Sequence, residues 1–343
     1  MQPDLLPAVM PLSIVTAPTG SLRKAALSLL FSHLPSGQRE EHLESALAAL
    51  ERQELSLEHL FVARDGQEIL GVVLAVLRPG GAVFLWPPVA RAGCRSDDVS
   101  ASLLESVAAR VDEQGAQFTQ CLLDPSDTRG RSALDAGGFP YVTDLILLSR
   151  PIGEDDVEAV KRVVKVEGVE QPESEHGFDT STISTTLTPS TLSFESYSAD
   201  SHAAFARLVE RTYQGTLDCP VLARLRGGEE SLEAHRATGR FSPEAWRLYR
   251  AQGQEIGVLL LAEHPDRDLW EVAYLGVIPE ARGRGVGRAI LRDGLALAQR
   301  SGRSAVEIAV DAGNAPALDL YRELGFVDVR RFAVHLRVSQ RRN

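Results

Sequence analysis

The chain has 343 residues, which is enough for two domains of ordinary size that each bury a core of their own. Apolar residues make up 44% of it and charged residues 24%, a composition that is typical of globular proteins and excludes a disordered or fibrous chain. The 36 Lys and Arg residues against 47 Asp and Glu residues give a net charge of −11, which argues against nonspecific binding to nucleic acids or anionic membranes.

The first residues of the chain show no targeting signal. They lack a basic segment and contain three prolines within eleven positions, and no apolar run is long enough to span a bilayer. We therefore expect a cytoplasmic protein with no membrane partner. The three cysteines, Cys94, Cys121 and Cys219, have no CxxC spacing, so we expect reduced thiols and neither a disulfide framework nor a metal site.

Two related halves make up the chain. Residues 151–190 contain an acidic stretch, a mixed charged run and a run rich in Ser and Thr, which is typical of a linker. The segments before and after it align with an offset of about 187 residues. We therefore predict a first domain over residues 1–150, a linker over 151–190 and a second domain over 191–343, related by tandem duplication.

Predicted elements recur in the same order in both halves. Each half has one arm of a hairpin, a strand ended by proline, an amphipathic helix, a short strand and a closing Gly-Phe pair. The matching segments are 71–76 and 257–261, 82–89 and 269–279, and 138–139 and 325–326. In the second half we expect helices over Arg288–Arg300 and Ala315–Leu324 around a strand at 304–310, an order that predicts an α/β fold.

The turn before the first of these helices carries the strongest functional signal. Its three alternating glycines remove side chains that would keep an anion away, and leave backbone N–H groups at the positive end of the helix dipole. Three arginines add cationic partners for phosphate oxygens. The residues are Gly283, Gly285 and Gly287 with Arg282, Arg284 and Arg288. The pattern predicts a pyrophosphate site.

Other phosphate-binding motifs fit this turn poorly. The absence of Gly-Lys-Ser/Thr excludes a P-loop, and Arg288 stands where a dinucleotide motif counted from Gly283 needs its third glycine. The remaining alternative is a turn that serves only as a tight connection, although such a turn requires neither three glycines nor three arginines.

This stretch resembles the acyl-CoA signature of the GNAT superfamily of N-acetyltransferases, which is Arg/Gln-x-x-Gly-x-Gly/Ala after a strand ending in Val-x-Pro. Arg282, Gly285 and Gly287 match that signature position by position. Residues 314–326 are similar to the family's Asn-x-x-Ala-x-x-x-Tyr-x-x-x-Gly-Phe block. The close match covers roughly residues 255–330.

The resemblance implies two tandem GNAT-like domains, each a central mixed β-sheet flanked by helices. It implies that acetyl-CoA donates its acetyl group to the amine of a small molecule or peptide by direct attack. It places the pantetheine arm beside the backbone of Leu275, Gly276 and Val277, in a gap between two parallel strands, and Asn314 near the thioester. The pyrophosphate would lie on the turn formed by Arg282, Gly283, Arg284, Gly285, Val286, Gly287 and Arg288.

Direct transfer needs a base for the amine proton and an acid for the departing thiolate. By the resemblance, Tyr321 is the acid, and a phenol with a pKa of about 10 suits that task. The spacing of Tyr321 from Ala317 and Leu324 on one helix face is also that of an ordinary core tyrosine, which stays the alternative.

The base is less directly indicated. Some family members carry a glutamate where this chain has Ala309, and others carry one six residues before the last valine of the strand, which here is Glu271. Glu271 alternates with Ala273 and Leu275, so we expect it on an apolar face where its pKa would rise. A charge that meets solvent at the strand end is an equal alternative, and Glu307 is a third choice for the base.

The acceptor side of the site is indicated only by the resemblance. The segment after the first helix of the second half would shape it, which makes Tyr213 and Asp218 candidates for substrate binding and Cys219 a further residue on that side. For Cys219 the favoured interpretation is a small buried side chain, and the reaction does not require an acyl-cysteine.

The first half lacks the corresponding residues. Its aligned turn keeps a single glycine and adds two carboxylates that would repel a pyrophosphate, and its last helix has lost the tyrosine. The residues concerned are Gly93, Asp97 and Asp98, with Leu134 in place of Tyr321 and Asp127 in place of Asn314. We therefore predict that this half is structural and that it covers the second domain or shapes the acceptor pocket.

Two functions stay open at this level. Glu271 and Tyr321 together favour an acetyltransferase, whereas Ala309 favours a protein that binds or senses acyl-CoA without catalysis.

Overall fold

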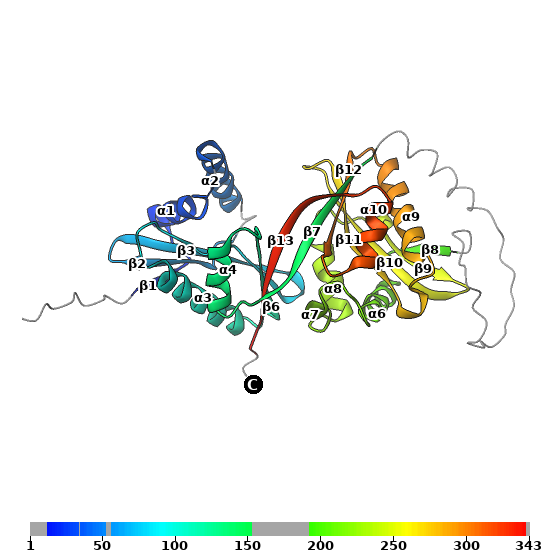
Figure 1. Ribbon diagram of the computed structural model, residues 1–343. Helices are drawn as coiled ribbons and strands as arrows, with labels where there is room; N and C mark the ends of the chain where they lie inside the picture. Colours follow the sequence, from blue (N-terminus) through cyan, green and yellow to red (C-terminus); the bar gives the residue numbers. More distant parts are fainter. Residues whose placement is uncertain (1–11, 34, 53–55, 153–191, 341–343) are drawn as a thin grey trace, which may run out of the picture. The chain divides into compact units, whose positions relative to one another are not determined.

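The computed structural model describes residues 12–33, 35–52, 56–152 and 192–340 (Figure 1). These residues form two compact units. The first holds the described residues up to Thr143 together with those from Phe332 onward, and the second runs from Asp144 to Arg331. Most of the predicted linker, from residue 153 to residue 190, lies outside the described residues.

The first unit is a mixed sheet with helices packed on it. Its strands follow the order β1-β2-β3-β4-β6-β13, with β5 also paired to β3, and the pair β4 and β6 is parallel. Its elements are β1 (Ser13–Thr16), α1 (Gly20–Leu30), α2 (Ser36–Glu51), β2 (Leu60–Asp65), β3 (Glu68–Arg78), η1 (Pro79–Gly81), β4 (Ala82–Leu85), β5 (Val89–Ala90), α3 (Ser96–Glu113), β6 (Phe118–Leu123) and α4 (Thr128–Ala136).

The second unit has the same plan. Its strands follow the order β7-β12-β11-β10-β9-β8, and here the pair β11 and β12 is parallel. Its elements are β7 (Tyr141–Pro151), β8 (Leu192–Ser196), α6 (His202–Thr212), α7 (Pro220–Ala223), α8 (Gly228–Arg236), η5 (Pro243–Ala245), β9 (Trp246–Ala251), β10 (Gln254–His264), β11 (Leu269–Val277), η6 (Pro279–Ala281), α9 (Val286–Arg300), β12 (Ala305–Asp311) and α10 (Ala315–Glu323). The last strand, β13 (Val327–Val338), begins in the second unit and continues from Phe332 onward in the first.

The duplication extends to the helix caps. Helices α4 and α10 correspond at an offset of about 187 residues and contain 9 residues each. Asp127 caps α4 by accepting a hydrogen bond from the Gly130 N–H at 2.9 Å, and Asn314 caps α10 by accepting one from the Ala317 N–H at 3.4 Å. The predicted α/β class, with a mixed sheet and flanking helices in each of two repeats, is confirmed.

The units do not coincide with the two halves of the sequence. Residues 333–338 of β13 pair with β6 in the first unit, and residues 145–151 of β7 pair with β12 in the second. Each half therefore supplies its last strand to the sheet of the other repeat. A division at residues 150 and 191 does not anticipate this exchange, because the pattern of a strand records its buried face and not its partner.

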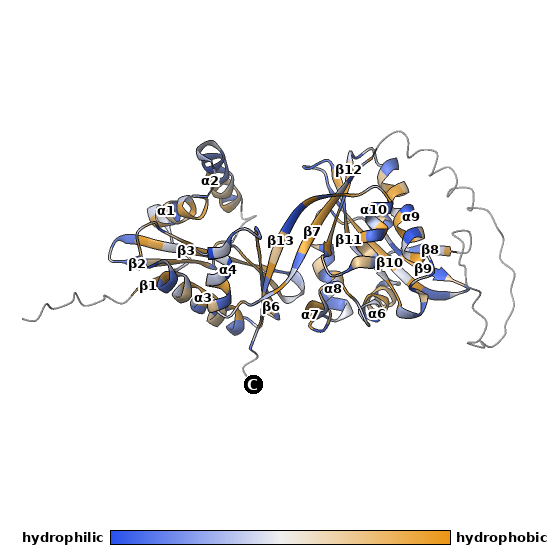
Figure 2. Ribbon diagram, viewed as in Figure 1, coloured by the Kyte–Doolittle hydropathy of each residue, from blue (hydrophilic) through white to orange (hydrophobic). Residues whose placement is uncertain are grey.

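Strand β10 forms the centre of the second unit. Its residues 256–263 are buried, and Figure 2 shows the apolar character of this sheet. Helix α6 packs on one face of β10 and helix α9 on the other, where Leu259 contacts Gly294 closely. A strand covered on both faces is expected to be continuously apolar, as GVLLLA is here. No helix among the residues that the structure describes is both long and apolar enough to cross a membrane.

The close packing of α8 on α6 predicts a sensitive position. A Cβ atom on Gly228 would lie 2.0 Å from the backbone oxygen of Ala206, so Gly228→Ala must push the two helices apart. We expect this substitution to lower the free energy of unfolding by about 2 kcal/mol in urea denaturation. Gly287→Ala is the matched control, because its Cβ would meet Leu320 at an ordinary 3.5 Å. Equal stability of the two variants would contradict this packing.

Candidate active site

Strands β11 and β12 diverge in the middle of the second unit. They pair from Leu269 and Ala305 up to Val272 and Ile308, and no pairing between them follows in the described residues. On its other edge β11 stays paired with β10 as far as Val277. The backbone groups of residues 273–277 that face β12 therefore lack a strand partner. This is the kind of gap into which the resemblance placed Leu275, Gly276 and Val277, whose contact with a cofactor stays a prediction.

The glycine turn continues directly from this gap. Gly283 and Gly285 have φ angles of 71° and 77°, in the left-handed region that favours glycine. Gly285 is the N-cap of α9, and the N–H groups of residues 283–288 find no backbone acceptor within the described part of the chain. Free donors at a helix N-terminus form a site for an anion.

The three arginines of the turn have different roles. Arg282 donates hydrogen bonds to the backbone oxygens of Val277 at 3.0 Å, Gly215 at 3.0 Å and Thr212 at 2.7 Å. The Arg282 guanidinium thus holds the loop after α6 against the end of β11. The predicted contact of Arg282 with phosphate oxygens stays a prediction, and the sequence did not indicate these three carbonyl partners because two of them lie about 70 positions away.

The other two arginines also differ. Arg288 forms an ion pair with Glu323 of α10. Arg284 is half-buried and makes no hydrogen bond or ion pair with any described residue. Of the three, Arg284 is therefore the one whose charge is free to meet an anion on the turn.

A β-bulge in β11 decides which way Glu271 points. Ala273 has no partner on β10, because the residues before and after it pair with adjacent residues of that strand. Because of this bulge, the side chain of Glu271 lies on the same face of the sheet as Tyr274 and Gly276. We had expected it on the face of Ala273 and Leu275, and that expectation was wrong because an extra residue breaks the alternation of a strand. The face that Glu271 occupies is the one that α6 covers.

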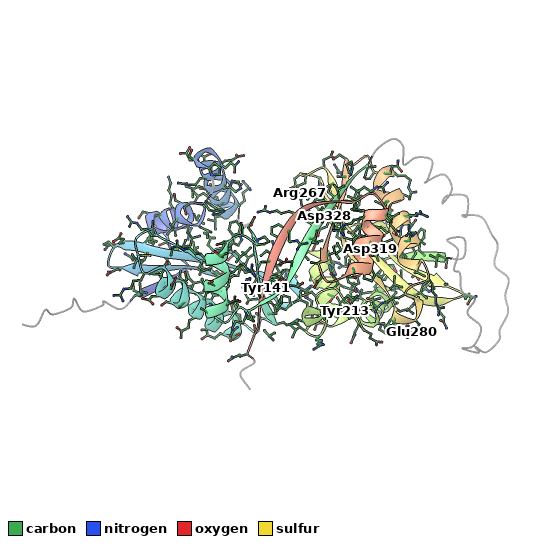
Figure 3. All side chains as sticks on the ribbon, in the orientation of Figure 1. Tyr141, Tyr213, Arg267, Glu280, Asp319 and Asp328 are labelled. Carbon is green, nitrogen blue, oxygen red and sulfur yellow. The ribbon has the colours of Figure 1, made fainter. Side chains whose placement is uncertain are left out.

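Glu271 has a defined partner on that face. Its Oε2 atom lies 2.9 Å from Nε2 of His264. The side chain of Glu271 is 31% exposed, so the carboxylate is partly buried and can still be reached by solvent. Glu307 is its neighbour across the strand pair and is bound at 2.5 Å by Arg267, which Figure 3 labels. This ion pair makes Glu307 the weaker candidate for a base.

Aromatic side chains cover the same face beyond Glu271. The hydroxyl of Tyr213, labelled in Figure 3, donates to Oγ of Ser231 at 2.7 Å, and its ring meets Tyr274 edge-on at 5.7 Å. The hydroxyl of Tyr274 forms a hydrogen bond with Oγ1 of Thr212 at 2.6 Å. The ring of His235 stacks on the ring of Tyr274, with 5.3 Å between the ring centroids. Burial raises the pKa of both tyrosines. Sequence reasoning missed Tyr274 and His235, because a bulge and a helix face bring them together.

His235 adds an uncharged imidazole to this cluster. Burial, and to a smaller extent the charge of Arg226, lower the pKa of His235 to about 3. The ring is therefore neutral at physiological pH and contributes an aromatic surface without repelling a cation.

The loop after α6 is fastened to the end of β12 by two reciprocal hydrogen bonds. The Asp311 N–H donates to Oδ1 of Asp218 at 2.8 Å, and the Cys219 N–H donates to Oδ2 of Asp311 at 3.0 Å. Loss of hydration raises the pKa of the Asp218 carboxyl, and the charge of Asp311 adds to this. The loop thus brings Asp218 to the mouth of the gap. Asp311 was not identified from the sequence, although its place at the end of a strand, two residues before Gly313, is a usable signal.

Cys219 lies in the same loop but is a poor nucleophile. Burial raises the pKa of its thiol to about 11, so the thiol stays protonated at neutral pH. This agrees with its interpretation as a small, largely buried side chain.

Tyr321 reaches the site from α10 on the far side of the gap. It is 6% exposed and packs near Phe326, yet its hydroxyl makes no hydrogen bond to the described residues. Burial and the charge of Asp218 raise the pKa of its phenol, which keeps its proton in place at neutral pH. Tyr321 thus belongs to the core and also presents a protonated hydroxyl. Asn314 is seen here only as the cap of α10, so its contact with a cofactor stays a prediction.

The first unit lacks these donors at the equivalent positions. Pro87 and Pro88, which correspond to Tyr274 and Leu275, have no backbone N–H to offer. The equivalent helix α3 carries two acidic residues, Asp97 and Asp98, in its first turn. This gives the predicted loss of function in the first half a second physical basis in its backbone.

Comparison with known proteins agrees with this geometry. Residues 210–326 match the model of the acetyltransferase (GNAT) family. A mycothiol acetyltransferase of Paenarthrobacter aurescens is 40% identical over 101 residues, which cover 28% of this chain and 31% of the relative. One of Thermomonospora curvata is 40% identical over 105 residues, or 31% of this chain and 34% of the relative. The chain thus matches about a third of the length of these curated relatives.

The whole fold also has a counterpart among solved structures. The structure of a GCN5-related N-acetyltransferase from Sphaerobacter thermophilus aligns with this chain at a TM-score of 0.58 and 17% sequence identity. The alignment covers 96% of this chain and 96% of the other. At that identity the likeness concerns the fold alone.

The hydrogen bonds of Arg282 predict a stability effect at the turn. Arg282→Gln removes the charged donors that join β11 to the loop after α6, so we expect the free energy of unfolding to fall by about 2 kcal/mol. Arg284→Gln is the matched control and should change it by less than about 0.5 kcal/mol. Urea denaturation of both variants measures the difference, and a loss at Arg284 as large as at Arg282 would refute the assignment.

Proposed function

We propose that this chain is an acyl-CoA-dependent N-acetyltransferase whose site lies in its second unit, because residues 210–326 match the model of the GNAT family. One observation carries the proposal. The part of β11 that has no partner on β12 is followed directly along the chain by the turn before α9, whose N–H groups have no backbone acceptor among the described residues. An extended ligand with amide groups at one end and a pyrophosphate at the other matches both parts. Acetyl-CoA is such a ligand.

The cofactor binds mainly through the backbone. The amides of the pantetheine arm pair with those backbone groups of residues 273–277 that have no strand partner and are not bound by Arg282, as an added strand would. The pyrophosphate accepts hydrogen bonds from the N–H groups of residues 283–288, and Arg284 supplies a free positive charge. Binding through the backbone needs few side chains, and this agrees with the presence of three glycines in the turn.

The reaction follows from the groups around the thioester end. The amine nitrogen of the acceptor attacks the thioester carbonyl carbon, an N–C bond forms, and the C–S bond breaks. Glu271 takes the amine proton, directly or through one water molecule, and Tyr321 gives its proton to the departing thiolate. Direct attack is supported by the protonated thiol of Cys219, which is unsuited to form an acyl intermediate.

The acceptor is the amine of a small molecule or peptide. The relatives named above are mycothiol acetyltransferases, but they share only a third of their length with this chain. The face that the acceptor would meet carries Tyr213, Tyr274 and the neutral His235, with Asp218 at its edge. Aromatic rings and a carboxylate favour a cationic amine.

The acid role of Tyr321 predicts a specific loss of rate. In Tyr321→Phe the thiolate must leave without a proton donor, so we expect kcat to fall about 100-fold while binding of acetyl-CoA stays unchanged. Release of free thiol from acetyl-CoA over a panel of amines measures the rate, and the exposed Tyr141→Phe is the control. An unchanged kcat would remove Tyr321 from the mechanism. A wild type that binds acetyl-CoA but acetylates no amine would favour the binding or sensing function that Ala309 suggests.

The free charge of Arg284 predicts a loss of affinity. Arg284→Gln removes a cation from the pyrophosphate site, so we expect acetyl-CoA to bind about tenfold more weakly. Arg95→Gln, at the aligned turn of the first unit, is the control and should leave the affinity unchanged. Isothermal titration calorimetry gives both numbers, with one cofactor per chain expected, and a second site abolished by Arg95→Gln would contradict the loss of function in the first unit.

A further inference from the structure

The proposed base has a histidine bound to it that the mechanism above does not use. Nε2 of His264 lies 2.9 Å from Oε2 of Glu271, which is hydrogen-bond distance. His264 ends β10 and Glu271 is the third residue of β11, so the hairpin between these two strands places both side chains on one face of the sheet. The imidazole is 16% exposed and is held mainly by protein.

The surrounding backbone is shaped to hold this imidazole. A Cβ atom on Gly239 would lie 2.9 Å from Cε1 and 3.0 Å from Nε2 of His264, and 2.7 Å from the backbone oxygen of Glu263. Only a residue without a side chain leaves the ring this space. The neighbouring Arg240 fixes the segment by pairing its backbone with that of Glu263 in both directions.

Three other carboxylates near the pair are bound by arginines instead. Glu307, beside Glu271, is bound by Arg267. In and beside the turn between the two strands, Glu263 pairs with Arg240 and Arg303, and Asp268 pairs with Arg303. Glu271 differs from these three carboxylates because its partner is a histidine.

We propose that His264 is a positioning residue for the base, in that its Nε2–H donates to Oε2 of Glu271 and leaves Oε1 to receive the amine proton. This inference rests on the proposed function. The hydrogen bond fixes the rotation of the carboxyl group, and it persists after Oε1 is protonated because Oε2 then acts as a carbonyl oxygen. The amine proton ends on Oε1, and His264 neither gains nor loses a proton during transfer.

Two substitutions of His264 separate positioning from folding. His264→Ala removes the donor, and we expect kcat to fall about tenfold with less than a twofold change in the KM for acetyl-CoA. His264→Gln restores an N–H donor at this position, so kcat should return to within about threefold of the wild type. His202→Gln, which breaks the remote His202–Glu229 pair at 2.6 Å, is the matched control and should leave kcat unchanged.

A second measurement keeps the test independent of catalysis. In two-dimensional NMR spectra of the histidine rings, Glu271→Gln should shift the ring resonances of His264 and leave those of His202 unchanged, because it alters the group that accepts the Nε2–H hydrogen bond. Unchanged resonances of His264, or equal loss of kcat in His264→Ala and His264→Gln, would overturn the proposal. If no amine is acetylated but the His264 resonances shift, the proposed function fails while the His264–Glu271 pair stands.

Discussion

The site depends on one constraint, which is that β11 and β12 stop pairing after Val272 and Ile308 while both strands continue. Backbone N–H and C=O groups need partners when water is excluded, so strands that separate in this way leave an edge that an extended ligand can complete. The surrounding residues keep the gap open. Arg282 ties the loop after α6 to the end of β11, and the hydrogen bonds of Asp311 with Asp218 and Cys219 tie the same loop to β12.

Some features around the site were predictable because their signals are local in sequence. The glycine turn before α9 and the start of α10 at Ala315 come from short motifs, whereas the role of Asn314 as the cap of α10 was not foreseen. The face of Glu271 was not predictable, because the bulge at Ala273 carries no clear signal in an apolar strand. The stack of His235 on Tyr274 joins residues about 40 positions apart, and only the tertiary fold brings them together.

The two units show that this fold and its binding site have separate requirements. The first unit keeps the strand order, the parallel pair and even the capped helix α4. It has prolines at 87 and 88 and acidic residues in the first turn of α3, where the second unit offers N–H groups and glycines. A core tolerates such changes because they alter exposed donors and charges and leave the buried apolar pattern intact. Duplication has thus preserved the architecture of the first unit without the glycines and N–H groups of the second.

We infer that acetyl-CoA binds to the backbone of the unpaired part of β11 and of the turn before α9, and that it binds in the second unit alone. Amide hydrogen exchange with and without the cofactor tests this most directly, because it reports on the N–H groups themselves. We predict slower exchange at residues 273–277 and 283–288 when acetyl-CoA is added, and no change at residues 86–98 of the first unit. Exchange that is unaltered in both segments of the second unit, or slowed equally in the first, would contradict the account.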